Sequence, residues 1–518
     1  MSLPGLEPGH TGNTLSLDSD SINDPINGPI NIYNGDVKLA NKDEPQYLTL
    51  SIGMQWSLEL GKQDLVGQHV KIYITVLSGI CEVLGTELAN DVEYCFQDWN
   101  FSVLAIEDSR IKWRLVNLMI PLDDPFINNV TPNDNAKYVY NLHFAIEKLR
   151  CSSFTGPKVL ILGNKNTGKT SLSRILSSYS IKNKAYQPMF INLDPEQPIV
   201  SPPGCIMATP ISDLIDLQSP FWNESLTSGA TKLHSRQPLI KNFGFEKIED
   251  NFDWYVDTVR QMLDTVDRRL YNDPLVQRSG CIIDTPSCFY ESYESFESVL
   301  NMIISKMKID IIVILSANTN NDISTTINAE PINKIIDKNK CSVIKLPKLT
   351  GVIPNDDAYK RLLQRLAIRD YFYGDLNTVI TPYVTSCDFT DLIIWELPVN
   401  NRSDTFNGSA NVGDASIPSN NQNNGNNNNT ENDMSADTVK SLTLQPVEVN
   451  QPNLQHAIIT IYHCPKRTEP KQILQSSVMG FALITEVNEK RQRCKLLLPV
   501  PGSLPKNALV LTSYRYLE

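Results

Sequence analysis

Hydrophobic positions divide the chain into three parts with different patterns. From about 46 to 150, short runs of β-branched and aromatic residues recur at the spacing of a β-sandwich. Residues 137–151 have helical periodicity and lead into the second part. From about 155 to 380, near-continuous apolar runs alternate with helical segments, which is the pattern of a parallel sheet covered on both faces. Strand-like runs resume from 457 onward.

These patterns, together with polar stretches, predict the domain boundaries. The N-terminus is rich in Gly, Pro, Asn, Ser and Asp, and an Asn-rich tract near the C-terminus has almost no large apolar residue, so neither can bury a core. We expect a disordered tail at 1–44, a β-rich domain at 45–136, a central domain at 137–380 and a C-terminal α/β domain at 381–518 with a disordered insertion at 400–436.

Composition narrows the class of protein. The 518 residues suffice for about three domains, and no window approaches 18 uninterrupted apolar residues, so we expect no membrane span and no membrane partner. The N-terminus lacks the features of a signal or transit peptide, which predicts a cytosolic or nuclear protein. Ten cysteines without a C-x-x-C pair indicate reduced thiols rather than disulfides or zinc ligands. A net charge of −12 argues against a surface that broadly coats nucleic acid.

The strongest chemical signal is the stretch "GNKNTGKT" at 163–170, which matches G-x-x-x-x-G-K-[ST] at every fixed position. It follows the apolar run "KVLIL" and precedes a helical segment. Backbone N–H groups of such a loop surround a phosphate at a helix N-terminus, the lysine reaches the outer phosphates, and the threonine hydroxyl binds Mg²⁺. The alternative is a glycine-rich turn without a ligand. The predicted nucleotide-binding residues of the loop are Gly163, Asn166, Thr167, Gly168, Lys169, Thr170 and Ser171.

Two apolar runs end in aspartates that are candidates to orient the magnesium ion. Asp194 ends "MFINLD" and Asp284 ends "GCIID". A carboxylate at the end of a strand beside the loop is what a bound nucleotide requires for its metal. We favour Asp194 for the catalytic position and Asp284 for the second strand, so Thr170, Asp194 and Asp284 form the predicted metal set. Gln197 follows Asp194 by three residues and is a candidate to order a water or an attacking hydroxyl. The alternative is that one aspartate merely caps a turn.

Arginines recur every four residues at Arg361, Arg365 and Arg369, which places them on one face of a helix. Such a face can close over phosphates as an arginine finger does. The composition alone favours the alternative, a solvated face with salt bridges.

Several stretches together carry a family resemblance. They are "VLGTELAND" (83–91), "FINLDPEQPIVSPPGCIMATPI" (190–211), "GCIIDTPS" (280–287), "VIKLPKLTGVI" (343–353), "IRDYFYG" (368–374) and "GSLPKNALVL" (502–511). In this order they resemble the polyribonucleotide 5′-hydroxyl kinase family, and within it the subunit of the pre-mRNA 3′-end cleavage and polyadenylation machinery. The resemblance spans roughly 46–518 apart from the Asn-rich tract.

The resemblance implies an α/β multidomain fold. A central P-loop NTPase domain with a mostly parallel sheet is flanked by an N-terminal β-sandwich and a C-terminal α/β domain. It also implies bound ATP and Mg²⁺ and a nuclear location. Fungal members of the family look like ATP-holding scaffolds joined to a larger cleavage factor IA subunit that carries an RNA polymerase II tail-binding domain. Other 3′-end processing factors are expected partners, with pre-mRNA contacted indirectly.

Departures from active kinases favour a scaffold. Glu196 stands in place of a glycine in the active Asp-x-Gly-Gln run, Cys288 in place of a tryptophan that stacks on RNA, and Gln364 and Ala367 in place of lid arginines. The resemblance also places Gln55 where an acidic residue helps to hold adenine, and Asn100 or Phe101 where a lysine stands. Asp194, Gln197 and Arg369 are therefore vestigial catalytic candidates, and Gln55 is a candidate base contact.

Three functions stay open from the sequence. The first is an ATP-binding structural subunit of the cleavage and polyadenylation complex, which links its members. The second is an active RNA 5′-hydroxyl kinase, for which Lys169, Asp194 and a lid arginine are nominally present. The third, an NTPase that acts as a motor or switch, is the least favoured because no repeat or second nucleotide motif occurs.

Overall fold

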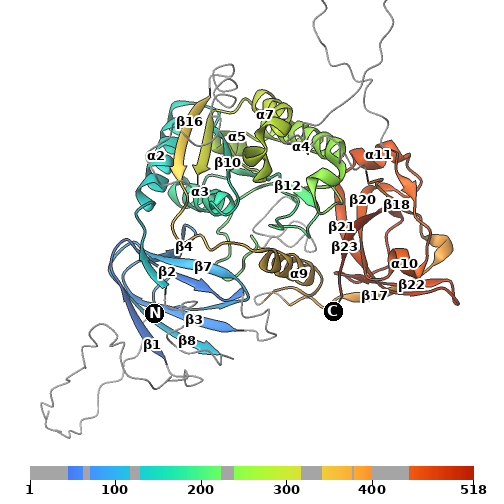
Figure 1. Cartoon of the computed structure of the whole chain (residues 1–518), viewed down its shortest axis with the longest axis horizontal. Coiled ribbons are helices and arrows are strands. Elements are labelled where there is room, and N and C mark those ends of the chain that lie inside the picture. Colours follow the sequence, from blue (N-terminus) through green and yellow to red (C-terminus); the bar gives the residue numbers. More distant parts are fainter. Residues whose placement is uncertain are drawn as a thin grey trace, which may run out of the picture.

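A computed structural model describes residues 45–61, 70–116, 129–222, 238–316, 341–375, 379–399 and 443–517. The predicted disordered segments at 1–44 and 400–436 lie outside these ranges. Figure 1 shows the N-terminal strands, the central helices and sheet, and the C-terminal sheet as three adjoining domains. Among the described residues, no helix is both long and apolar enough to span a bilayer.

The N-terminal domain is a sandwich of two antiparallel sheets. Alternation in β3 buries Ile72, Ile74 and Val76 on one side of their sheet, and Trp56 from the facing sheet joins the same core. One sheet runs β1 (Gln46–Leu50), β8 (Ser109–Val116), β3 (Lys71–Ser78) and β6 (Glu93–Gln97). The other runs β5 (Thr86–Leu88), β4 (Cys81–Val83), β7 (Asn100–Ala105), β2 (Met54–Glu59) and β9 (Asn129–Pro132).

The central domain contains a seven-stranded mixed sheet. Its order is β13 (Leu239–Asn242), β12 (Cys205–Pro210), β11 (Met189–Asn192), β14 (Cys281–Asp284), β10 (Lys158–Gly163), β15 (Ile311–Ser316) and β16 (Ser342–Pro347). The strands β11, β14, β10, β15 and β16 are parallel to one another. At the β11 edge, β12 and β13 are added in antiparallel orientation. The strand that precedes the glycine loop, β10, therefore lies inside the sheet with β14 directly beside it.

Helices cover both faces of this sheet, because its inner strands are apolar on both sides. Val159 and Ile161 of β10 pack with α2 (Ala136–Ser152) and α3 (Lys169–Lys184). Leu160 and Leu162 face the opposite core. That core includes α4 (Phe252–Asn272), α5 (Pro274–Ser279), α6 (Cys288–Glu291) and α7 (Tyr293–Met307), with a short 3₁₀ turn at Ile248–Asn251 before α4.

The C-terminal domain is a second seven-stranded sheet that packs against the central domain. The buried ammonium of Lys241 in β13 joins the two domains, since its Nζ donates to the carbonyls of Gln475 and Ser476 at 2.5 and 3.0 Å. The strand order of the C-terminal sheet is β17 (Tyr383–Asp388), β22 (Arg493–Leu498), β21 (Val478–Asn488), β20 (Ala457–Pro465), β23 (Asn507–Arg515), β18 (Ile394–Glu396) and β19 (Gln445–Pro446). Short helical turns lie at Phe389–Asp391, α10 (Gln451–Leu454) and α11 (Pro470–Gln475).

One helix, α9 (Asp357–Tyr373), contacts all three domains. Figure 1 shows it below the central sheet, between the N-terminal strands and the C-terminal sheet. The Tyr359 hydroxyl accepts a hydrogen bond from the backbone N–H of Asn100 at 2.8 Å, and the Tyr371 hydroxyl accepts one from Phe481 at 2.9 Å. The helix therefore ties the two flanking domains together.

The predicted fold class is confirmed, with additions. The central strands and helices that the hydrophobic pattern predicts are present, as is the helix that leads into the loop strand. Ten short or irregularly patterned strands were not predicted: β5, β6, β9, β12, β13, β16, β17, β18, β19 and β23. In the C-terminal domain the sheet dominates, and its described helices have only four and six residues.

Candidate functional site

The predicted loop connects β10 to α3 in the geometry of a phosphate-binding loop. Three of its residues have positive φ: Gly163 at 155°, Asn166 at 60° and Gly168 at 94°. Hydrogen bonds within the loop stabilise this conformation, since Lys169 Nζ donates to the carbonyls of Gly163 and Asn164 at 3.1 and 3.0 Å. The Thr167 hydroxyl also donates to the Asn164 carbonyl, at 2.8 Å. In this conformation the N-terminus of α3 faces the space that the loop encloses.

A side chain at Gly168 would clash with its neighbours and strain the loop. A Cβ at Gly168 would lie 2.7 Å from Val352 Cγ2 and 3.1 Å from Leu349 Cδ1, and its φ of 94° disfavours other residues. We expect Gly168→Ala to weaken nucleotide binding by about tenfold, since the strain of roughly 1–3 kcal/mol must be relieved by displacing the loop. Equilibrium dialysis with labelled ATP measures this. Gly53→Ala is the matched control, because Gly53 also has positive φ, but among the described residues no atom lies within 4 Å of the added Cβ.

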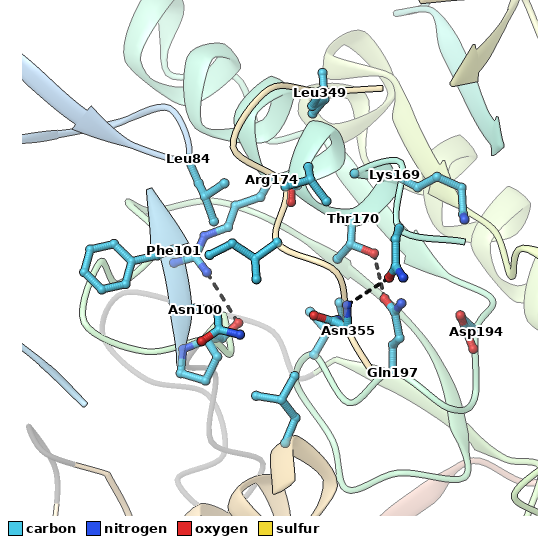
Figure 2. A pocket seen from close by; sticks show the side chains of 18 of the residues that line it. Leu84, Asn100, Phe101, Lys169, Thr170, Arg174, Asp194, Gln197, Leu349 and Asn355 are labelled. Atoms are coloured by element: carbon cyan, nitrogen blue, oxygen red, sulfur yellow. Dashed lines mark hydrogen bonds between the residues drawn. The ribbon is translucent and has the colours of Figure 1, made fainter. Parts of the chain in front are cut away.

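The loop forms one end of a cavity of about 680 Å³. Figure 2 shows Leu84, Asn100 and Phe101 on one side of this space and Lys169, Thr170 and Gln197 on the other. The cavity thus lies between the N-terminal sandwich and the central domain, and α9 supplies part of its wall. Its lining includes Gln55, Leu84, Trp99, Asn100, Phe101, Ser102, Asn166, Gly168, Lys169, Thr170, Ser171, Arg174, Asp194, Gln197, Cys288, Asn355, Tyr359 and Arg361. A volume of this size accommodates a nucleoside triphosphate.

Thr170 contacts two of the other predicted residues. Its Oγ1 lies 2.6 Å from Asp284 Oδ2 and 2.7 Å from Gln197 Oε1. A single hydroxyl hydrogen serves only one of these acceptors at a time. The second oxygen of Asp284, Oδ1, is buried and has no hydrogen-bond partner among the residues that the structure describes. Burial raises the pKa of Asp284 to about 6. This arrangement of a hydroxyl and a carboxylate beside the loop fits Mg²⁺, which takes few protein oxygens and keeps waters and phosphate oxygens.

Asp194 lies on the cavity wall but is not a hydrogen-bond partner of Thr170. The reason is the strand order, because β14 is the neighbour of β10 and β11 lies one strand further out. The Asp194 carboxylate accepts the backbone N–H of Glu196 at 3.0 Å. Burial and the nearby Glu196 carboxylate raise the pKa of Asp194 to about 7. The structure thus brings Asp284, rather than Asp194, into direct contact with the loop threonine.

Gln55 stands on the N-terminal side of the cavity, where the resemblance places a base contact. Its Oε1 accepts a hydrogen bond from Asn133 Nδ2 at 2.8 Å. Asn100 and Phe101 line the same side. The side-chain oxygen of Asn100 is engaged, since it accepts the backbone N–H of Gly61 at 3.0 Å.

The three predicted arginines do not converge on the cavity. Arg361 is exposed and lines it, whereas Arg365 is exposed and does not. Arg369 lies near the other end of α9, where its guanidinium contacts Asp370 at 3.1 Å and lies 4.0 Å from Asp98. The helical spacing was right, but the helix is long enough to carry its last arginine away from the loop.

Two further residues at the site, Asn355 and Arg174, were not predicted from the sequence. Asn355 donates its backbone N–H to Asn166 Oδ1 at 3.1 Å and so holds the loop from outside. Arg174 is buried beside the cavity with its guanidinium 5.7 Å from the Trp99 ring, and burial lowers the pKa of Arg174 to about 10. Neither position belongs to a motif that residue spacing alone could reveal.

Comparison with known proteins identifies the family. Three family models match: the N-terminal beta-sandwich domain of polyadenylation factor over 49–153, the P-loop of mRNA cleavage and polyadenylation factor CLP1 over 163–374, and pre-mRNA cleavage complex II protein Clp1 over 380–518. The mRNA cleavage and polyadenylation factor CLP1 of Saccharomyces cerevisiae is 43% identical over 93% of this chain and 96% of its own length. The chain belongs to the CLP1 family. The predicted resemblance and the nucleotide-binding P-loop are thereby confirmed.

Further CLP1 relatives match this chain over a similar share of its length. The protein of the same name from Vanderwaltozyma polyspora is 43% identical over 92% of this chain, and that of Debaryomyces hansenii is 30% identical over 94%. A solved structure of wild-type Clp1p in complex with a Pcf11p segment matches with a TM-score of 0.77 and 42% identity, over 93% of this chain and 100% of the other. Another solved structure describes an extended Pcf11p–Clp1p interface and the basis of ATP loss in a glycine-to-arginine mutant, also with a TM-score of 0.77.

Proposed function

We propose that this chain is an ATP-holding structural subunit of the nuclear pre-mRNA 3′-end cleavage and polyadenylation complex. The observation that carries the proposal is the position of the cavity. The glycine loop forms one end, strands of the N-terminal sandwich form the other, and α9 joins both to the C-terminal sheet. A ligand bound there contacts two domains at once, so its binding energy stabilises their assembled arrangement by mass action.

The residues around the loop support retention of the nucleotide rather than transfer of its phosphate. Ala367 is packed in an apolar cluster with Phe221 and Tyr359, and its methyl group supplies no charge. Gln364 is buried and donates to the backbone carbonyl of Glu196 at 3.0 Å. Cys288 lines the cavity but offers no aromatic face to a base. These three positions, where the resemblance places two lid arginines and an aromatic residue in active kinases, therefore carry uncharged side chains.

The proposed ligand is ATP with Mg²⁺. Backbone N–H groups of the loop and Lys169 would hold the phosphates, and Thr170 with Asp284 would hold the metal, whose charge neutralises the phosphate oxygens. Asp194 and Gln197 would orient waters of the metal. Gln55 and the neighbouring strand residues would face the base.

Active RNA 5′-hydroxyl kinase is the second candidate function. Lys169, Asp194 and Arg361 all line the cavity, so a phosphate-binding lysine, a carboxylate base and one cation are present together. Of the three predicted lid arginines only Arg361 lines the cavity, which makes efficient catalysis less favourable, since one transition-state arginine contributes about 10³-fold or more.

A phosphate-transfer assay separates the two candidates. The purified full chain is incubated with Mg²⁺, γ-labelled ATP and a 5′-hydroxyl RNA oligonucleotide, with an active polynucleotide kinase as control. In parallel, bound nucleotide is extracted and identified. We expect no labelled RNA and recovery of intact ATP. Labelled RNA at a rate near that of the control would replace the structural role with the kinase.

The proposed partners are those of the solved relatives. Clp1p is described in complex with Pcf11p, so we propose that this chain binds the corresponding larger subunit of cleavage factor IA, together with other 3′-end processing factors. Purification of the tagged chain from its own cells should recover that subunit from nuclear extract. Recovery of no 3′-processing subunit would contradict the proposed role.

A further inference from the structure

Two residues that depart from the kinase pattern contact each other across the cavity rim. Glu196 follows β11, and Gln364 lies on α9. Gln364 Nε2 donates to the Glu196 carbonyl at 3.0 Å, and Lys360 Nζ lies 2.8 Å from Glu196 Oε2. Lys360 and Gln364 are four residues apart, so they project from the same face of the helix. One residue of the central domain is therefore held by two side chains of α9.

The Glu196 end of this contact is fixed to the central sheet. Its backbone N–H donates to Asp194 Oδ1 at 3.0 Å, and prolines at 195 and 198 restrict the turn. The Pro195 carbonyl accepts the Gly204 N–H at 2.9 Å. These bonds and prolines anchor the Glu196 end of the contact to the central sheet.

The helix end of the contact forms a wall of the cavity. Lys360, Arg361 and Leu363 of α9 line it, and Asn355 in the segment just before the helix holds the glycine loop through Asn166. Displacement of this part of α9 would uncover the loop. Bonds between α9 and Glu196 therefore oppose the motion by which a bound nucleotide would be exposed.

We propose that Glu196, Lys360 and Gln364 form a latch that keeps α9 closed over the nucleotide and slows its release. The proposal rests on the nucleotide-holding role proposed above and explains how a ligand can be retained without being consumed. It also gives Glu196 and Gln364, which are unsuited to phosphate transfer, a role of their own.

The two contacts of the latch differ in strength. The side chains of Lys360 and Glu196 are 23% and 32% exposed, so water and salt screen their attraction. The Gln364 side chain is buried, and its hydrogen bond to the carbonyl is shielded from solvent. We expect loss of the ion pair to speed release about two- to threefold, and loss of both contacts to speed it about tenfold.

The test is the release rate of a fluorescent ATP analogue from the full chain, chased with excess ATP in a stopped-flow instrument. Lys360→Met removes the ion pair, Gln364→Leu removes the buried bond, and the double variant removes both. Reversal of the charges with Glu196→Lys and Lys360→Glu together should restore slow release. Arg365→Met is the control, because Arg365 lies on the same helix, is exposed and does not line the cavity.

The salt dependence of release gives a second readout. Release from the natural chain should quicken as NaCl rises, and this dependence should weaken in Lys360→Met. If the chain binds the analogue and the double variant releases it no faster than the natural chain, the latch is overturned while the nucleotide-holding role stands. If the natural chain binds no nucleotide, both proposals are overturned. A double variant that does not fold leaves the salt dependence and the charge reversal to decide.

Discussion

Replacing Lys169 with alanine should yield a folded protein that is almost free of nucleotide. The ammonium of Lys169 is buried at the loop and donates to the carbonyls of Gly163 and Asn164. A triphosphate placed against the loop would exchange these carbonyls for its own charged oxygens. Hydrogen bonds to charged groups contribute about 1.5–3 kcal/mol each. With one or two such bonds lost, the affinity for ATP should fall by roughly 100-fold or more.

Isothermal titration with ATP and extraction of the co-purified nucleotide both measure this effect. Lys182→Ala is the matched control, since Lys182 lies on the same helix, at its far end, and its ammonium pairs with Glu87 at 3.2 Å. The natural chain and the control should melt at higher temperature when ATP is added, and the Lys169 variant should not, because only a bound ligand stabilises the fold. Unchanged nucleotide content in Lys169→Ala would refute the assignment of the loop.

The sequence predicted the glycine loop well, because everything that specifies it is local. An apolar strand, the eight-residue motif at 163–170 and a helix adjoin in the sequence, and each shows its own pattern. The contact between Thr170 and Asp284 was less predictable. It depends on β14 rather than β11 being the neighbour of β10, and strand order is set by tertiary packing that residue periodicity does not encode.

Helix α9 could likewise be predicted from the sequence only in part. Its period correctly predicted a helix with three arginines on one side. Which side faces the cavity depends on packing against three domains, and that packing buries Gln364 and Ala367 while it leaves Arg365 exposed. The resemblance identified Glu196 and Gln364 as departures from active kinases. Their contact with each other became visible only when residues 168 positions apart in the chain were placed side by side.

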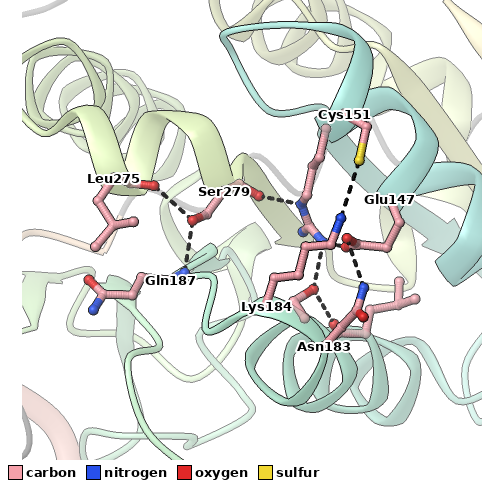
Figure 3. Close-up of polar contacts among 10 residues, drawn as sticks. Glu147, Cys151, Asn183, Lys184, Gln187, Leu275 and Ser279 are labelled. Atoms are coloured by element: carbon pink, nitrogen blue, oxygen red, sulfur yellow. Dashed lines mark hydrogen bonds and ion pairs between the residues drawn. The ribbon is translucent and has the colours of Figure 1, made fainter.

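A second large effect is expected at Arg150 of α2, which does not line the cavity. Figure 3 shows this region, where α2, α3 and α5 meet around polar side chains. Arg150 is 1% exposed, and its guanidinium pairs with Glu147 on its own helix. It also donates to the Ser279 carbonyl at 2.9 Å and to the Ser180 hydroxyl at 2.9 Å. The other oxygen of Glu147 accepts from Asn183 Nδ2 at 3.0 Å. One arginine therefore joins three helices.

We expect Arg150→Ala to lower the free energy of unfolding of the central domain by about 3–5 kcal/mol, because it leaves a buried carboxylate without its cation. Urea unfolding followed by tryptophan fluorescence measures the loss. If the unpaired charge is the cause, the double variant Arg150→Met with Glu147→Leu should recover most of it, since apolar replacement of a buried pair is often neutral. A double variant as unstable as Arg150→Ala would instead indicate that the bonds to Ser279 and Ser180 dominate. Because Ser180 lies near the end of α3 opposite to Lys169, the folded fraction of Arg150→Ala should still bind ATP, and ATP should raise its stability.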